Sequence, residues 1–287
     1  MNAKKKISLV LGSGGAKGYA HIGVIEELEK RGYEIVSISG ASMGALIGGL
    51  YACGKLQTYK EWALTLDPLD VASLVDFSFH SGGLIKGEKV FAEIAKMIGK
   101  RTFESLDIRF TAVATDVRHK KEVWFQSGDL LTALRASIAI PSIFTPVKME
   151  GMVLADGGIL NPLPIAPTMS DISDMTIAVS LYADLPKPDI SISSEEKKVR
   201  TKFTEVFMEL IGSFSSKKEE FDMFDILDMS FETMQNGLTR YRLGGYPPDV
   251  LIEISKDVCQ TYEFHKAAEV IEAGRIAARE QLDAKGL

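Results

Sequence analysis

The sequence predicts a three-layer α/β/α sandwich built around a mainly parallel sheet, followed by a C-terminal helical segment. Short apolar runs alternate with longer amphipathic runs through the first half of the 287-residue chain, which is typical of a parallel sheet covered by helices. Glycine-rich turns follow two of the strand-like runs, at 12–18 and 40–44. A charged helical region lies later, ahead of a last strand and a last helix.

The elements can be justified in chain order. The helix at 18–31 places apolar residues on one face, and the helix at 42–53 is apolar nearly all round, which predicts a central, buried position. The helix at 129–137 stops before Pro141. The predicted strands are 7–11, 35–38, 110–117, 122–126, 152–155, 176–181 and 250–254. The predicted helices are 18–31, 42–53, 56–66, 88–98, 129–137 and 262–282.

Composition narrows the class of protein. Hydrophobic residues make up 46% and charged residues 25%, as in an ordinary globular protein. The net charge of −6 argues against a nucleic-acid partner, which needs clustered Lys and Arg. Cys53 and Cys259 form neither a disulfide framework nor a metal-ligand pair. We therefore predict a cytoplasmic protein without a metal or another cofactor.

The N-terminus resembles the start of a signal peptide, because three lysines precede the apolar run 7–11. That run is shorter than the apolar region of a signal peptide, so we predict a buried first strand instead. The longest apolar run, 43–53, is shorter than the roughly 20 residues of a membrane span. We expect no membrane-spanning helix.

The pentapeptide Gly40-Ala41-Ser42-Met43-Gly44 lies between a strand and a helix. A G-x-S-x-G in this setting is typical of a nucleophile elbow, a tight turn that presents a serine hydroxyl above a parallel sheet. Gly40 and Gly44 lack a Cβ, which lets the turn and the helix behind it pack closely. Ser42 is therefore a candidate nucleophile.

The segment from Gly12 to Gly18 lies at the first strand-to-helix turn. Free N–H groups at a helix start form a pocket for negative charge, which suits a phosphate or the oxyanion of acyl transfer. Lys17 is followed by glycine instead of Ser or Thr, so the P-loop pattern is not met. The spacing also departs from the dinucleotide fingerprint. A simple tight turn is the remaining alternative.

A serine nucleophile needs a base to accept its proton, and none of the four histidines is well placed for that role. His21 falls within the first helix, and His80 and His119 lie in polar, turn-like surroundings. The order Ser42, Asp156, His265 matches an α/β-hydrolase triad, but His265 lies within a predicted helix.

The alternative base is Asp156. It ends the strand 152–155 and precedes Gly157 and Gly158, so it is expected at the same sheet edge as Ser42. Partial burial would raise the pKa of this carboxylate, and a hydrogen bond to the serine would position it.

Taken together, Gly14–Gly18, Gly40–Gly44 and Asp156–Gly158 resemble the motif set of the patatin-like phospholipases. The resemblance extends to Ala114-Thr115-Asp116, Ala136–Pro141 and Asn161-Pro162, and covers roughly residues 6–181. Two positions depart from the pattern, since Ser13 replaces a glycine and Lys17 replaces an arginine. Lys17 keeps the charge but loses the guanidinium fork.

The resemblance implies a Ser42–Asp156 dyad that hydrolyses carboxylic ester bonds of lipids through an acyl-serine. It implies an oxyanion hole around Gly14 and Gly15, with Lys17 and Met43 also assigned there. No metal is required. Alternatives are an acyltransferase or thioesterase with the same dyad, and a regulatory protein on a hydrolase scaffold.

Composition changes after residue 185, which predicts a patatin-like domain at 1–185 and a helical addition at 186–287. The addition contains a predicted helical hairpin at about 193–237 and ends in a strand and helix that pack back on the first domain. Its two apolar stripes are Phe203, Phe207, Leu210, Ile211 and Phe214, and Phe221, Phe224, Leu227, Phe231 and Met234. We expect these stripes to be buried against the rest of the chain or in a homo-oligomer through 203–234. The alternative is a cap or a lipid-facing surface, with transient contact of a peripheral protein with the membrane.

Overall fold

The computed structural model describes residues 4–74, 87–141, 144–190 and 223–287. Within these ranges eight strands form one sheet, in the order β5-β6-β3-β2-β1-β7-β8, and β4 also pairs with β3. The strands are β1 (Lys6–Leu11), β2 (Glu34–Ala41), β3 (Arg109–Asp116), β4 (Lys121–Phe125), β5 (Val147–Met149), β6 (Met152–Asp156), β7 (Met175–Ala183) and β8 (Val250–Ser255).

The sheet is parallel at its centre and antiparallel at one side. β1 pairs in parallel with β2 and β7, β2 with β3, and β7 with β8. The antiparallel pairs are β3 with β4, β3 with β6, and β5 with β6. The predicted α/β class with a mainly parallel sheet is therefore confirmed. The short strand β5 has no counterpart in the sequence prediction.

Apart from α4 (Pro68–Leu74), which has no counterpart in the sequence prediction, the helices differ from the prediction mainly at their ends. They are α1 (Ala20–Lys30), α2 (Met43–Ala52), α3 (Leu56–Thr65), α4 (Pro68–Leu74), α5 (Glu88–Ile98), α6 (Leu130–Ser137), α8 (Met223–Gly245) and α9 (Ala267–Asp283). Single 3-10 turns are η1 (Gly15–Tyr19), η2 (Phe103–Ser105), η3 (Gly157–Ile159), η4 (Ala166–Thr168) and η5 (Phe264–Lys266). The expected helix at 18–31 starts only at Ala20, because η1 occupies the preceding turn. The last helix likewise begins after η5. No helix in the described ranges is long and apolar enough to cross a membrane.

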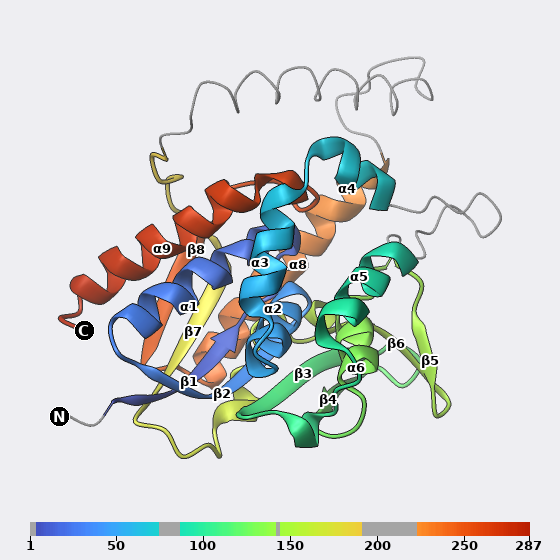
Figure 1. Cartoon of the computed structure of the whole chain (residues 1–287), viewed down its shortest axis with the longest axis horizontal. Helices are drawn as coiled ribbons and strands as arrows, with labels where there is room; N and C mark the ends of the chain where they lie inside the picture. The colour runs from blue at the N-terminus through green and yellow to red at the C-terminus, as the bar shows by residue number, and fades with distance from the viewer. Residues whose placement is uncertain (1–3, 75–86, 142–143, 191–222) are drawn as a thin grey trace.

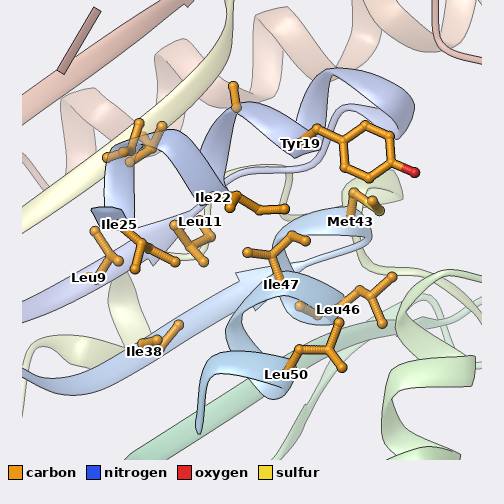
Figure 2. Packing of buried hydrophobic residues seen from close by; sticks show 14 of the residues in the cluster. Leu9, Leu11, Tyr19, Ile22, Ile25, Ile38, Met43, Leu46, Ile47 and Leu50 are labelled. Carbon is orange, nitrogen blue, oxygen red and sulfur yellow. The ribbon is translucent and has the colours of Figure 1, made fainter. Parts of the chain in front are cut away.

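One face of the sheet carries the large core (Figure 1; Figure 2). Leu9 and Leu11 of β1 point to this face and pack with buried residues of α1 and α2, including Ile22, Ile47 and Leu50. The tight packing of α1 against α9 extends the same core to the C-terminal helix. β1 is thus the buried strand that the sequence predicted.

The opposite face is covered by a thinner layer. Val10 and Ala178 pack there against Leu163 and Ile165, with Leu243 of α8 beside them. In Figure 1, α8 lies behind the sheet and the larger helical layer lies in front. Helices on both faces complete the predicted three layers.

The C-terminal region joins this same sheet. β8 extends it beyond β7, and α9 packs on α1. The division at residue 185 stays a prediction. Residues 193–222 of the predicted hairpin lie outside the described residues, and α8 continues to Gly245, past the predicted end at 237.

Two positions of the second apolar stripe are not buried against the described part of the chain. Leu227 is 51% exposed and Met234 is 58% exposed, whereas the buried positions of α8 include Gln235 and Thr239. Polar side chains can occupy this interface because they find hydrogen-bond partners there, as described below. The stripe at 203–214 lies outside the described residues.

β2 and β6 share one edge of β3. β4 pairs with Ala112–Asp116, which overlaps the residues of β3 that pair with β2 and those that pair with β6. Since a strand has only two edges, β4 lies along one edge and β2 and β6 lie along the other. β2 pairs with β3 up to the pair Ala41 and Val113. β6 takes over at the next residue of β3, where Asp156 pairs with Ala114. The end of β2 and the end of β6 therefore meet along β3.

Candidate active site

Ser42 lies in the tight turn between β2 and α2. Its backbone has φ 54° and ψ −127°, a conformation that non-glycine residues rarely adopt. Gly44 allows α2 to approach β1, since a Cβ there would lie 2.1 Å from the carbonyl oxygen of Leu11. This is the geometry of a nucleophile elbow.

A buried serine holds this turn. The amide of Ser42 donates to Oγ of Ser137 at 3.0 Å, and Oγ of Ser137 donates to the carbonyl of Val113 at 2.7 Å. Ser137 is fully buried at the end of α6. Ser137 belongs to the segment Ala136–Pro141, but no sequence pattern predicted a role for it.

The glycine-rich turn is fixed by neighbouring backbone groups. The amide of Ser13 donates to Pro162 at 2.8 Å, and the amide of Ala16 donates to Thr261 at 2.8 Å. Gly15 has φ 54°, and a Cβ there would lie 2.5 Å from the carbonyl oxygen of Thr261. Within the described ranges, no group accepts a hydrogen bond from the amides of Gly14 or Gly15. Two free donors remain next to Ser42.

His21 supports this turn from behind. Its Nε2 donates to the carbonyl oxygen of Gly12 at 2.8 Å. Complete burial lowers the pKa of His21 to about 4, so the ring is neutral at pH 7. His21 does not line the pocket, which agrees with the packed position expected for it.

Asp156 is fully buried at the end of β6. Its Oδ1 accepts a hydrogen bond from the amide of Gly158 at 2.7 Å. Burial raises the pKa of Asp156 to about 7, while interactions with the Ser42 hydroxyl and the Gly158 amide oppose that rise. Its Oδ2 has no hydrogen bond of regular geometry to any described residue. The carboxylate therefore has an unused acceptor beside Ser42.

Ser42 and Asp156 line one pocket, together with Gly14 and Gly15 (lining residues Gly14, Gly15, Ser42, Ile140, Asp156, Tyr182, Phe231, Glu232, Gln235 and Thr261). Three of these residues, Phe231, Glu232 and Gln235, belong to α8. Ser42 is only 3% exposed, and α8 forms one wall of its pocket.

Polar contacts attach α8 over the pocket. Glu232 forms an ion pair with Lys17 and accepts a hydrogen bond from Thr261 at 3.1 Å. Gln235 accepts a hydrogen bond from the hydroxyl of Tyr182. Further along the helix, Arg242 donates to the carbonyl of Leu160 at 3.0 Å and pairs with Glu122. No sequence pattern predicted these contacts of α8.

Lys17 has a different position from the one expected in the oxyanion hole. Its amide donates to the carbonyl of Gly14 at 3.1 Å, and its buried ammonium is paired with Glu232. The ammonium also lies 5.6 Å from the centre of the Tyr182 ring. The amide is therefore engaged, and the ammonium is paired with α8. The amide of Met43, at the start of α2, donates to no group in the described part of the chain.

The other predicted motif residues surround the pocket. Gly157 and Gly158 follow Asp156 in η3. Gly18 abuts Met43, since a Cβ at Gly18 would lie 2.2 Å from the side chain of Met43. Gly12 and Gly40 lie at the ends of β1 and β2 respectively.

The other two histidines in the described part of the chain, His119 and His265, do not line the pocket. His119 interacts with Asp116 at 2.5 Å beyond the end of β3, and His265 lies in η5. His80 lies outside the described residues. His265 is not among the residues that line the pocket with Ser42 and Asp156, so the pocket does not support the triad alternative. Nor is there, among the residues that the structure describes, a cluster of three His, Cys, Asp or Glu side chains able to hold a metal ion.

Comparisons with known proteins agree with this geometry. The sequence model of a family described as patatin-like phospholipase matches residues 9–169, a span that contains both Ser42 and Asp156. An uncharacterized NTE family protein of Mycobacterium tuberculosis is 36% identical, over 99% of this chain and 93% of its own length.

More distant relatives are larger. The lysophospholipase NTE1 of Scheffersomyces stipitis is 28% identical over 62% of this chain, and the match covers 12% of that relative. The crystal structure of VipD from Legionella pneumophila superposes with a TM-score of 0.50 at 16% identity, over 98% of this chain and 67% of VipD. This last similarity concerns the fold.

Proposed function

Because this chain belongs to the patatin-like phospholipase family of lipid acyl hydrolases, we propose that it cleaves carboxylic esters of lipids through an acyl-Ser42 intermediate, with Asp156 as the base. The observation that carries the proposal is the common pocket of Ser42 and Asp156, with an unused oxygen on the carboxylate. The raised pKa of Asp156, about 7, supports the assignment, since a general base works best when its pKa lies near the working pH.

In the first half-reaction, Oγ of Ser42 attacks the ester carbonyl carbon while its proton passes to Asp156. The tetrahedral intermediate then expels the alcohol, which takes the proton from Asp156. In the second half-reaction, Asp156 removes a proton from water, the hydroxide attacks the acyl-serine, and the proton returns to Oγ as the acid leaves. No net charge or proton is gained by the protein.

We assign the oxyanion hole to the backbone amides of Gly14 and Gly15, with the amide of Met43 as a third donor. Support comes from their free N–H groups, since an oxyanion hole needs donors that are fixed before the substrate arrives. The hydrogen bonds of Ser13 and Ala16 on either side supply that fixation. Lys17 is left out of this assignment because its amide and ammonium are both engaged.

The substrate we propose is a lipid ester of the phospholipase A or lysophospholipase type. Ile140, Tyr182 and Phe231 give the pocket apolar walls suited to an acyl chain. Two relatives, from Scheffersomyces stipitis and Neurospora crassa, bear the name lysophospholipase. Transfer of the acyl group to an alcohol or a thiol would use the same intermediate.

We also propose transient contact with a lipid surface through α8. Its exposed apolar side chains include Ile226, Leu227 and Met229, each 51% exposed. Sedimentation with vesicles measures this contact directly. Cytoplasmic localisation and a homo-oligomer through 203–234 stay predictions, and most of that stretch lies outside the described residues.

An organophosphonate that reacts with serine nucleophiles tests the mechanism. We expect it to label Ser42 in the wild-type chain and to label nothing in the pocket of Ser42→Ala. Hydrolysis of phospholipids, lysophospholipids and short-chain esters should be lost in Ser42→Ala and in Asp156→Asn while both variants stay folded. Esterase activity in a folded Ser42→Ala variant would overturn the mechanism. Product analysis with an added alcohol or thiol distinguishes hydrolysis from transfer.

A further inference from the structure

One short segment contacts the backbones of both Ser42 and Asp156. Ser137, at the end of α6, accepts a hydrogen bond from the amide of Ser42 at 3.0 Å. Two residues later, the carbonyl of Ala139 accepts a hydrogen bond from the amide of Asp156 at 2.9 Å. The nucleophile and the base are thus both attached to residues 137–139.

The hydroxyl of Ser137 also reaches the strand that lies between the two residues. It donates to the carbonyl of Val113 at 2.7 Å. Val113 is the last residue of β3 that pairs with β2, and the next residue, Ala114, pairs with Asp156. A single side chain therefore connects the turn at Ser42 to the strand that positions Asp156.

The turn at Ser42 depends on such a contact. Its positive φ is unfavourable for a residue with a side chain and persists only where the surroundings fix it. The bond from its amide to Ser137 limits rotation of the peptide group before Ser42, and this rotation sets the direction of the Cα–Cβ bond. The bond is shielded from bulk solvent, because Ser137 is fully buried and Ser42 is 3% exposed.

We propose that Ser137 is a positioning residue that fixes the Ser42 hydroxyl relative to the Asp156 carboxylate. The inference rests on the proposed function. A hydroxyl suits this position because it accepts from one backbone group while it donates to another. A thiol does both weakly, and a methyl group does neither.

The experiment compares Ser137→Ala with Ser39→Ala. Ser39 is the matched control, because it is also fully buried, lies three residues before Ser42 on β2, and donates to the carbonyl of Pro164 at 2.7 Å. Hydrolysis of one short-chain ester is measured, and each kcat is divided by the fraction of molecules that the phosphonate labels. Unfolding midpoints are recorded for both variants.

We expect Ser137→Ala to lower kcat by about 10- to 100-fold with KM within about twofold, since small misplacements of reacting groups cost this much. Ser39→Ala should keep kcat within about threefold despite a similar fall in its unfolding midpoint, because it disturbs no contact of Ser42. Ser137→Cys is nearly isosteric with the wild type and should give a kcat between those of wild type and Ser137→Ala. If Ser137→Ala does not fold, Ser137→Cys alone is compared with Ser39→Ala.

The proposal is overturned if Ser137→Cys and any folded Ser137→Ala lose no more kcat than Ser39→Ala, or if their losses appear in KM instead. The proposed function fails separately, through activity in Ser42→Ala. An inactive Ser42→Ala together with unaffected Ser137 variants would reject the positioning role alone.

Discussion

The ammonium of Lys17 in the glycine-rich turn forms an ion pair with the carboxylate of Glu232 on α8. The two residues are 215 positions apart in the chain, and the lysine is buried. The pair connects the candidate oxyanion hole to the helix that closes the pocket. Ser42 is 3% exposed and Asp156 is fully buried in the arrangement in which this pair is formed.

Weakening that ion pair should increase access to Ser42. We expect Glu232→Gln to raise the labelling rate of Ser42 by a bulky phosphonate about fivefold, as a loss of ~1 kcal/mol from the closed state would do. The labelling rate is measured with phosphonates of two sizes. Met234→Ala, an exposed position on the same helix, is the control and should leave both rates unchanged. If Glu232→Gln labels no faster than wild type, the ion pair does not control access.

Activity should rise with pH through neutrality. Asp156 has a pKa of about 7 and must be deprotonated to accept the serine proton. We therefore expect kcat/KM for a neutral short-chain ester to increase about tenfold per pH unit below pH 7 and to level off above it. A rate profile between pH 5 and 9 measures this. A flat profile across that range would contradict the role of Asp156 as the base.

The same carboxylate should lower stability as the pH rises. In the unfolded chain Asp156 loses its proton near pH 3.8, and in the folded chain near pH 7, so the folded state holds the extra proton between these values. The free energy of unfolding then falls with rising pH across this window, by on the order of 4 kcal/mol from this group alone. Folding lowers the pKa of other carboxylates, such as Glu26 and Glu263, so their contribution to stability has the opposite pH dependence. The contribution of Asp156 is therefore isolated by comparing wild type with Asp156→Asn. We expect the stability of Asp156→Asn relative to wild type to increase from pH 4 to pH 7 in urea titrations.

The two glycines after Asp156 should differ in their tolerance of a side chain. A Cβ at Gly157 would lie 2.1 Å from the backbone carbonyl oxygen of Val113, whereas a Cβ at Gly158 would meet side-chain atoms, foremost Nε2 of Gln235 at 2.1 Å. Backbone cannot move away as a side chain can. We expect Gly157→Ala to lower the free energy of unfolding by about 1–3 kcal/mol more than Gly158→Ala. Thermal or urea unfolding of both variants measures this, and equal losses would contradict it.

Local patterns predicted most of the sheet and the elbow, because they depend on neighbouring residues. The run at 7–11 is apolar enough to be a buried strand on its own, and G-x-S-x-G specifies its own turn. The fold class was predictable for the same reason. Asp156 could be singled out because it ends an apolar run, although its pairing with Ala114 follows only from the register of β6 on β3.

The rest depends on contacts between distant parts of the chain. The apolar spacing of α8 predicted a buried stripe, but the helix also contacts the rest of the chain through polar residues whose partners, such as Lys17 and Tyr182, lie far away in sequence. Lys17 was assigned to the oxyanion hole because of its place in the motif, and only the position of Glu232 reveals its actual partner. No sequence pattern marked Ser137, since the sequence does not distinguish a serine that becomes buried from any other serine.

The shared edge of β3 has a consequence for how the protein acquires activity. β2 and β6 each bring one catalytic candidate to that edge, and neither strand contacts the other's reactive residue until both have paired with β3. Pairing of segments far apart in sequence is slow compared with local helix formation. A partly folded chain that already contains its helices, but whose β2 and β6 have not yet paired with β3, therefore lacks the juxtaposition of Ser42 and Asp156 on which the proposed activity depends.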